Sequence, residues 1–170
     1  NQSYGNPQHN LLNKFNKLDA ENPKYSCGLM LSNYQLGRQN EATAIAQHII
    51  KHPKSNIHLV AEAKNIIGNS HWQNEELDKA KSIFQEVLSL HASDSIDRNI
   101  EAKLVALETK SKLNRNKLKQ ILISRSSNGL RMVLLNEVMQ KNSDFGLIHY
   151  LIGRQLHLDK QFPKSNQYLL

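Results

Sequence analysis

Two histidines and one cysteine are the residues whose chemistry could support a metal site or a nucleophile. His48 and His52 are four positions apart, so a helix would place both imidazoles on one face. No glutamate lies between them in the metalloprotease arrangement, and histidine is electrostatically favourable in the last turns of a helix. We therefore predict no metal site here. The apolar, helical surroundings of Cys27 favour a structural thiol over a nucleophile.

Motifs for other common reaction chemistries do not occur in the sequence. It contains no P-loop, no G-x-G-x-x-G pattern and no G-x-S-x-G nucleophile motif. Glu75 and Glu76 precede Lys79 and Lys81 at the spacing of ordinary ion pairs on a helix surface. No pair of carboxylates stands out from an apolar setting, as acid–base catalysis would require. We expect neither a catalytic site nor a cofactor.

A basic run is the strongest charge feature of a chain whose net charge is +7. No acidic residue occurs between positions 109 and 136, where the cations are Lys110, Lys112, Arg115, Lys117, Lys119, Arg125 and Arg131. Such a run could contact phosphate groups or an acidic partner. It lacks the interleaved aromatic side chains that single-strand binding uses. Nucleic acid or an anionic surface is the second candidate partner, and a solvated basic face is the simpler alternative.

The composition favours one all-helical domain. The 170 residues include 39% apolar and 22% charged residues, with only seven glycines, four prolines and a single cysteine. Few helix breakers favour helices over strands, and one cysteine excludes an internal disulfide. No stretch approaches the roughly 20 apolar residues that a membrane span needs. Because the chain starts at Asn1 and stops at Leu170 within an apolar helical pattern, we expect a piece of a longer protein.

Apolar residues recur at helical spacing along most of the chain. Residues 1–7 are expected to be a flexible lead-in, and residues 8–170 one domain. Asn22 and Pro23 are expected to start one helix, and Asp94 or Ser95 to cap a later one. Asn114 is expected to interrupt the helical pattern before the next helix. Residues 126–129 are the strongest loop signal. The remaining expected helices cover about 11–18, 42–50, 57–72, 75–90, 130–141 and 145–158, with a last one starting near residue 163.

Internal similarity is the most informative feature of the sequence. Gly68 and Ala80 are 12 positions apart, and so are Gly153 and Ser165. In both units a small residue on one helix would let the next helix pack closely, and a larger residue four positions later, such as Phe84, would fill the adjoining space. The pattern predicts helical hairpins that nest into one another.

These residues resemble the tetratricopeptide repeat family. Residues 61–94 carry the family's pattern of large, small and apolar positions, residues 23–53 carry it with Met30 in place of the small residue, and residues 146–170 carry it up to the chain end. Residues 95–142 depart from it, so the resemblance covers about half of the chain. It implies an all-α fold of antiparallel helix pairs stacked into a right-handed superhelix, or α-solenoid.

The resemblance also implies a function, which is binding a protein or peptide on a concave face lined by the first helix of each pair. The positions that would face this groove are Glu62, Asn65, Asn69, Trp72, Gln73, Tyr150, Arg154 and His157. Asn65 and Asn69 could clamp a peptide backbone, and Trp72 could be a binding hot spot. Alternatively, Trp72 packs against a neighbouring helix and the asparagines are solvated. A non-catalytic spacer attached to an enzyme or membrane protein is the other alternative.

Overall fold

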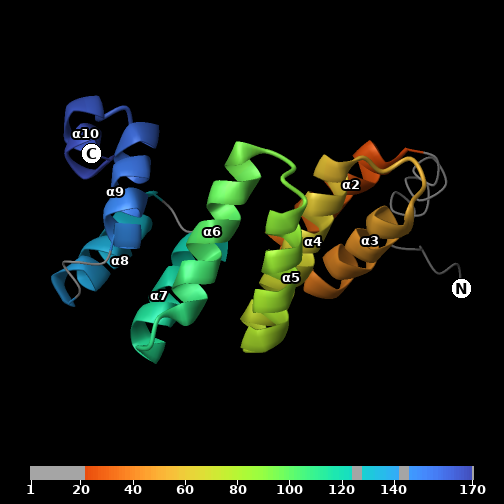
Figure 1. The fold of residues 1–170 in the computed structure, drawn as a ribbon, viewed down its shortest axis with the longest axis horizontal. Coiled ribbons are helices and arrows are strands. Elements are labelled where there is room, and N and C mark those ends of the chain that lie inside the picture. The colour runs from red at the N-terminus through yellow and green to blue at the C-terminus, as the bar shows by residue number, and fades with distance from the viewer. Residues whose placement is uncertain (1–21, 124–127, 142–145, 170) are drawn as a thin grey trace, which may run out of the picture.

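The computed structural model describes residues 22–123, 128–141 and 146–169 (Figure 1). In these residues the chain is all-α and contains no strand. The helices are α2 (Pro23–Gln35), α3 (Gln39–Lys51), α4 (Ile57–Gln73), α5 (Leu77–Ser89), α6 (Asp94–Glu108), α7 (Lys112–Ile123), α8 (Asn128–Lys141), α9 (Gly146–Leu158) and α10 (Phe162–Leu169). The all-α expectation is confirmed for the described part. The predicted lead-in and the helix at 11–18 lie outside it.

Local sequence signals account for the helix starts. Asn22 caps α2 by accepting a hydrogen bond from the amide of Lys24, and Pro23 occupies the first turn, as predicted. α6 differs from the prediction, because Ser93 is its N-cap and accepts from the amide of Ile96. The predicted caps, Asp94 and Ser95, were wrong by one or two residues. Ser93, Asp94 and Ser95 are all residue types that favour the N-cap position, so residue type alone did not distinguish them.

Two predicted interruptions lie inside helices. Asn114 is in the first turn of α7, where its amide donates to the hydroxyl of Ser111, so the helix starts earlier than expected. Asn128 and Gly129 belong to the start of α8, whereas the rest of that predicted loop lies outside the described residues. Polar residues that favour loops are also favourable at the start of a helix, which explains both errors.

The helices follow one another in a row from α2 at one end to α10 at the other (Figure 1). Each helix packs on its neighbour in sequence, and α4 in addition contacts α2, α6 and α7. α6 contacts α4 and also α9. Helix α6 therefore lies between the two ends of the row, with one side toward α4 and another toward α9.

The buried apolar side chains form two clusters that meet at α4. Ala63 and Ile66 of α4 belong to the cluster with α2 and α3. Ala61 and Trp72 of the same helix belong to the larger cluster, which continues through α5 to α9. One helix thus joins both clusters, because its apolar residues surround it rather than forming one stripe.

One turn geometry recurs at three helix ends. The residue after the helix cap has a left-handed backbone at Gly37 (φ 76°), Glu75 (φ 62°) and Lys160 (φ 58°). In each turn the next amide donates to a carbonyl five residues earlier, the hydrogen bond of a Schellman motif. A new helix starts two residues after each, at α3, α5 and α10. Helix α5 therefore begins at Leu77 rather than at 75, as the sequence had suggested.

The three hairpins also share small buried residues. Ala42, Ala80 and Ser165 each lie five positions after the left-handed residue and are completely buried. A β-carbon added at Gly68 would lie 2.5 Å from the ring of Phe84, and Ser165 donates a 2.9 Å hydrogen bond to the carbonyl of Gly153. The close approach predicted from the 12-residue spacing is confirmed in both units.

Candidate binding groove

The face of α4 predicted to bind a partner is closed. Trp72 is 1% exposed and packs edge-on against Phe84, with ring centroids 6.3 Å apart. Asn69 is buried, and Asn65 is half-buried. The packing alternative for Trp72 is therefore the one that the structure has, and the asparagines are not a solvated surface.

Lys103 of α6 fills the space in front of these asparagines. It is 2% exposed, and its Nζ donates to Asn65 Oδ1 at 2.6 Å and to Asn69 Oδ1 at 2.8 Å. The same nitrogen lies 5.2 Å from the centroid of the Phe84 ring, within cation–π range. A neutral amine has two N–H groups, so the two amide oxygens satisfy both of its donors.

Burial controls the protonation of this cluster. Desolvation lowers the pKa of Lys103 to about 7, opposed by the negative charge of Glu62. Burial also raises the pKa of Tyr34 to about 12, partly offset by a hydrogen bond with Asn69. The Tyr34 hydroxyl donates to the carbonyl of Ile123 at 2.9 Å, which ties α2 to the end of α7. The cluster thus joins four helices, α2, α4, α6 and α7, through a tyrosine that stays neutral and a lysine that burial shifts toward its neutral form.

Lys103 was missed by the sequence analysis, although a signal exists. It lies on the same helical stripe as Ile96, Ile100 and Leu107, at spacings of seven, three and four positions. A lysine inside an apolar stripe is expected either to extend its amine into solvent or to meet polar partners. Asn65 and Asn69, four apart on another helix, are those partners.

The remaining α4 positions have less defined environments. Glu62 is half-buried and, after burial itself, is the second cause that raises the pKa of the Cys27 thiol. A raised pKa means less thiolate, which agrees with a structural cysteine. Gln73 is half-buried, and its Oε1 is buried without a hydrogen bond to any described residue.

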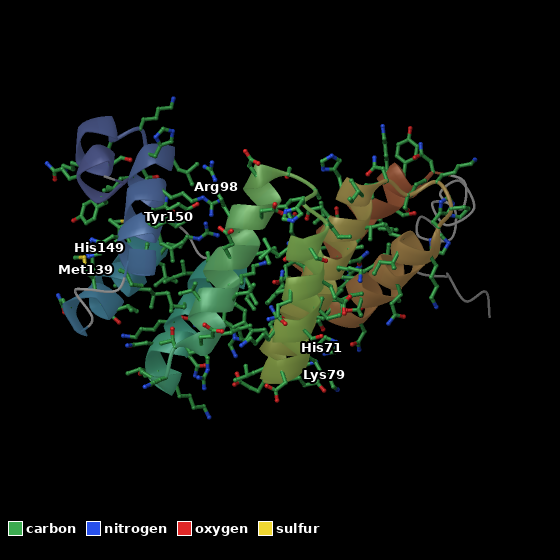
Figure 2. The ribbon with its side chains drawn as sticks, viewed as in Figure 1. His71, Lys79, Arg98, Met139, His149 and Tyr150 are labelled. Carbon is green, nitrogen blue, oxygen red and sulfur yellow. The ribbon has the colours of Figure 1, made fainter. Side chains whose placement is uncertain are left out.

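The structure brings the other three predicted residues together. Tyr150, Arg154 and His157 of α9 line an open groove of about 570 Å³ whose other wall is the start of α6. Figure 2 shows Arg98 of α6 and Tyr150 of α9 on facing sides of this space. Arg154 and His157 are exposed. This groove is the candidate site, and we call it the α6–α9 groove.

The groove carries two arginines on opposite walls. Arg98 projects from α6 and Arg154 from α9, and both are exposed. No described residue forms a hydrogen bond or ion pair with either guanidinium, although Asp94 also lines the groove. Arg98 was missed by the sequence analysis, since α6 lies in the stretch that departs from the repeat pattern. An arginine presents a planar fork of donors suited to carboxylates and phosphates.

The groove continues into a less polar depression of about 290 Å³. Its walls are Glu101, Ala102 and Val105 of α6 and Gly146 of α9, and it shares Arg98 and Tyr150 with the larger part. Val105 is 41% exposed and presents apolar surface to this depression. The α6–α9 groove thus has a cationic end and an apolar end.

The basic run does not form one continuous surface in the described residues. Lys117 is paired with Glu137 and Lys119 with Glu75, and Arg115 donates to the carbonyl of Thr109 at 2.9 Å. The hydrogen bond from Lys119 also holds the pKa of Glu75 below its ordinary value. The other members are placed as follows: Lys110 and Lys112 are exposed, Arg131 lines a cavity of about 180 Å³ beside Arg154, and Arg125 lies outside the described residues.

The described part of the chain offers neither a metal-binding cluster nor a membrane-spanning helix. The rings of His48 and His52 lie with centroids 5.7 Å apart, but no group of three or more histidine, cysteine, aspartate or glutamate side chains could hold a metal ion there. Across the same residues, none of the helices combines the length and apolar character that crossing a bilayer requires.

Comparison with protein-family models, with curated proteins and with solved structures found no match. The resemblance to tetratricopeptide repeats therefore rests on the residue pattern of the sequence alone.

Proposed function

We propose that this protein is a non-catalytic, helical-repeat interaction module that holds an acidic peptide segment of a partner protein in the α6–α9 groove. The three hairpins with one turn geometry support a tetratricopeptide-like stack, extended to an α-solenoid. Repeat stacks of this kind use their extended faces for binding.

The arginine pair is the observation that carries the proposal. Arg98 and Arg154 face a groove from two helices and bind no described side chain. Arginine is the residue best suited to bidentate recognition of carboxylates, and it is always charged. A groove that offers two such forks from opposite walls fits an anionic occupant.

The dimensions of the groove favour a peptide. Its α6 wall runs from Asp94 to Val105, eleven helical steps or about 17 Å. An extended chain rises about 3.3 Å per residue, so the wall spans about five residues of a peptide. Along this wall the side chains change from polar and charged, at Asp94 to Glu101, to apolar, at Ala102 and Val105, and such a change offers different contacts to successive peptide side chains.

The basic run is less suited to be the main site. Lys117 and Lys119 are each about one-sixth exposed and already paired, Lys117 with Glu137 of α8 and Lys119 with Glu75 of the turn between α4 and α5. Releasing them would break contacts between α7 and its neighbours. Only Lys110 and Lys112 are left as exposed lysines of the run in the described residues.

A charge-reversal titration tests the proposal. The probe is a fluorescein-labelled six-residue oligoglutamate, followed by fluorescence anisotropy at about 0.15 M salt, where long-range attraction is screened. We expect Arg98→Glu with Arg154→Glu to weaken binding at least tenfold. The matched control, Lys110→Glu with Lys112→Glu, changes the net charge equally and is expected to weaken binding less than threefold.

The two double variants separate the candidate sites. Equal losses in both would mean that the probe responds to net charge alone, and the groove would be rejected. A larger loss in the lysine variant would place the site on the basic run. Circular dichroism on each variant checks that the helices are retained.

A further inference from the structure

The apolar end of the α6–α9 groove has no role in binding an acidic side chain. We propose that it receives one large apolar side chain of the same peptide, so that the groove recognises a two-part motif of an acidic residue and an apolar residue two or three positions away. This inference rests on the proposed function and specifies the partner's chemistry.

The character of the walls supports this second contact. Ala102 is buried and small, Gly146 has no side chain, and Val105 exposes part of its apolar surface, so these three residues leave an open apolar surface beside the charged Arg98 and Glu101, which also line the depression. At about 290 Å³ it lies at the lower limit of small-molecule sites, which measure about 300–1,000 Å³. It suits a single large side chain better than a whole cofactor.

The equivalent face of α4 shows how an occupant can cover this surface. Counted from the left-handed residue of each hairpin, Tyr150 and Arg154 of α9 are the equivalents of Asn65 and Asn69 of α4, ten and six positions earlier. On α4 this face is covered by the chain itself, through Lys103. On α9 the same face remains open. Its polar group is the cation Arg154 instead of the neutral Asn69, so it requires an anionic occupant instead of an amine.

The geometry of α6 fixes the spacing of the motif. Ala102 and Val105 lie four and seven positions after Arg98, which corresponds to about 6–10 Å along the helix. An extended peptide covers this distance in two or three residues. Specificity therefore comes from the separation between the acidic and the apolar side chain, not only from their presence.

Labelled peptides in a glycine–serine host test the inference. One carries a single glutamate, and two others add a phenylalanine three positions before or three positions after it. We expect one of these orders to bind about tenfold more tightly than the glutamate peptide, a difference of about 1.4 kcal/mol. The gain should vanish when the two residues are placed adjacent to each other.

Variants of the apolar end localise the gain. A β-carbon at Gly146 meets no atom within 4 Å, so Gly146→Leu can be accommodated and would fill the depression, whereas Gly146→Ala leaves most of it open. We expect Gly146→Leu to abolish the phenylalanine gain and Gly146→Ala to retain it, where the gain is measured in each variant against its own affinity for the glutamate peptide. Val105 is exposed, so Val105→Gln should be tolerated by the fold, and it should reduce the phenylalanine gain without any change at Gly146.

The outcomes separate the two proposals. If the glutamate peptide binds through Arg98 and Arg154 but phenylalanine adds nothing in either order, or its gain persists in Gly146→Leu and Val105→Gln, the two-part motif is wrong and the acidic site stands. If no peptide binding responds to Arg98→Glu with Arg154→Glu, both proposals fall.

Discussion

Helices α4 and α9 occupy the same place in two hairpins that end in the same turn, yet one face is closed and the other is open. On α4, Asn65 and Asn69 meet the buried amine of Lys103. On α9, the equivalent Tyr150 and Arg154 line a groove. One repeat position can therefore serve stability or binding, depending on whether another side chain of the same protein, as Lys103 does on α4, fills the space in front of it.

Helix α6 makes this difference, because its two sides carry cations of different kinds. Lys103 faces α4 and can lose its proton when buried, so it tolerates a dry site with two amide oxygens. Arg98 faces α9 and stays charged at any ordinary pH, so it remains exposed to water or to an anionic partner. Lysine on the closed side and arginine on the open side match these requirements.

The largest expected effect concerns the pH dependence of stability on the closed side. The pKa of Lys103 is about 7 when folded and about 10.4 when unfolded. Between these values the unfolded chain binds more protons, so the free energy of unfolding should rise with pH. From pH 6 to pH 9 we expect this group alone to add about 2–3 kcal/mol, with no further change below the folded pKa.

Urea denaturation across this pH range measures the effect, with Lys103→Met as the reference. The wild-type protein should gain stability relative to Lys103→Met as the pH rises, whatever the other titrating groups contribute. Arg98→Met on the open side should leave the slope unchanged. Parallel curves for wild type and Lys103→Met would show that the amine keeps an ordinary pKa and is not buried as described.

A smaller effect is expected from the hairpin packing that both regions share. Gly68→Ala would place a methyl group 2.5 Å from the Phe84 ring, and the resulting overpacking should cost about 1–2 kcal/mol. Gly28 lies within α2 with no atom within 4 Å of its added β-carbon, so Gly28→Ala should instead stabilise the protein by up to about 1 kcal/mol.

Thermal unfolding of the two alanine variants checks this prediction, because the same chemical change is made at a packed and at an open position. Opposite shifts of the melting temperature are expected. Equal, stabilising shifts in both would mean that the hairpin leaves room at Gly68 and that helix propensity alone decides the outcome.

The sequence predicted the hairpins well because their signals are local. The small residues at Ala80 and Ser165, the cap at Asn22 and the close approach at Gly68 all follow from nearby spacing. The boundary at Leu77 was less predictable, because the left-handed turn uses Glu75 rather than the glycine that stands at position 37.

The site was predicted only in part, because its two walls are distant in sequence. Tyr150, Arg154 and His157 were expected on one face, and they do line one groove. Their counterpart Arg98 comes from a helix without the repeat pattern, and only tertiary packing brings it opposite α9. For the same reason, the asparagines of α4 pointed to a groove, whereas they hold Lys103.

Locating a bound acidic peptide on the protein tests directly whether the α6–α9 groove is the binding site. A glutamate- and phenylalanine-containing peptide with a nitroxide spin label at one end would broaden nearby amide signals in a nitrogen-15 NMR spectrum. We expect broadening along α6 and α9, around Arg98 and Tyr150, with the α4 face unaffected. Broadening confined to the α4 face or to residues 110–117 would contradict it.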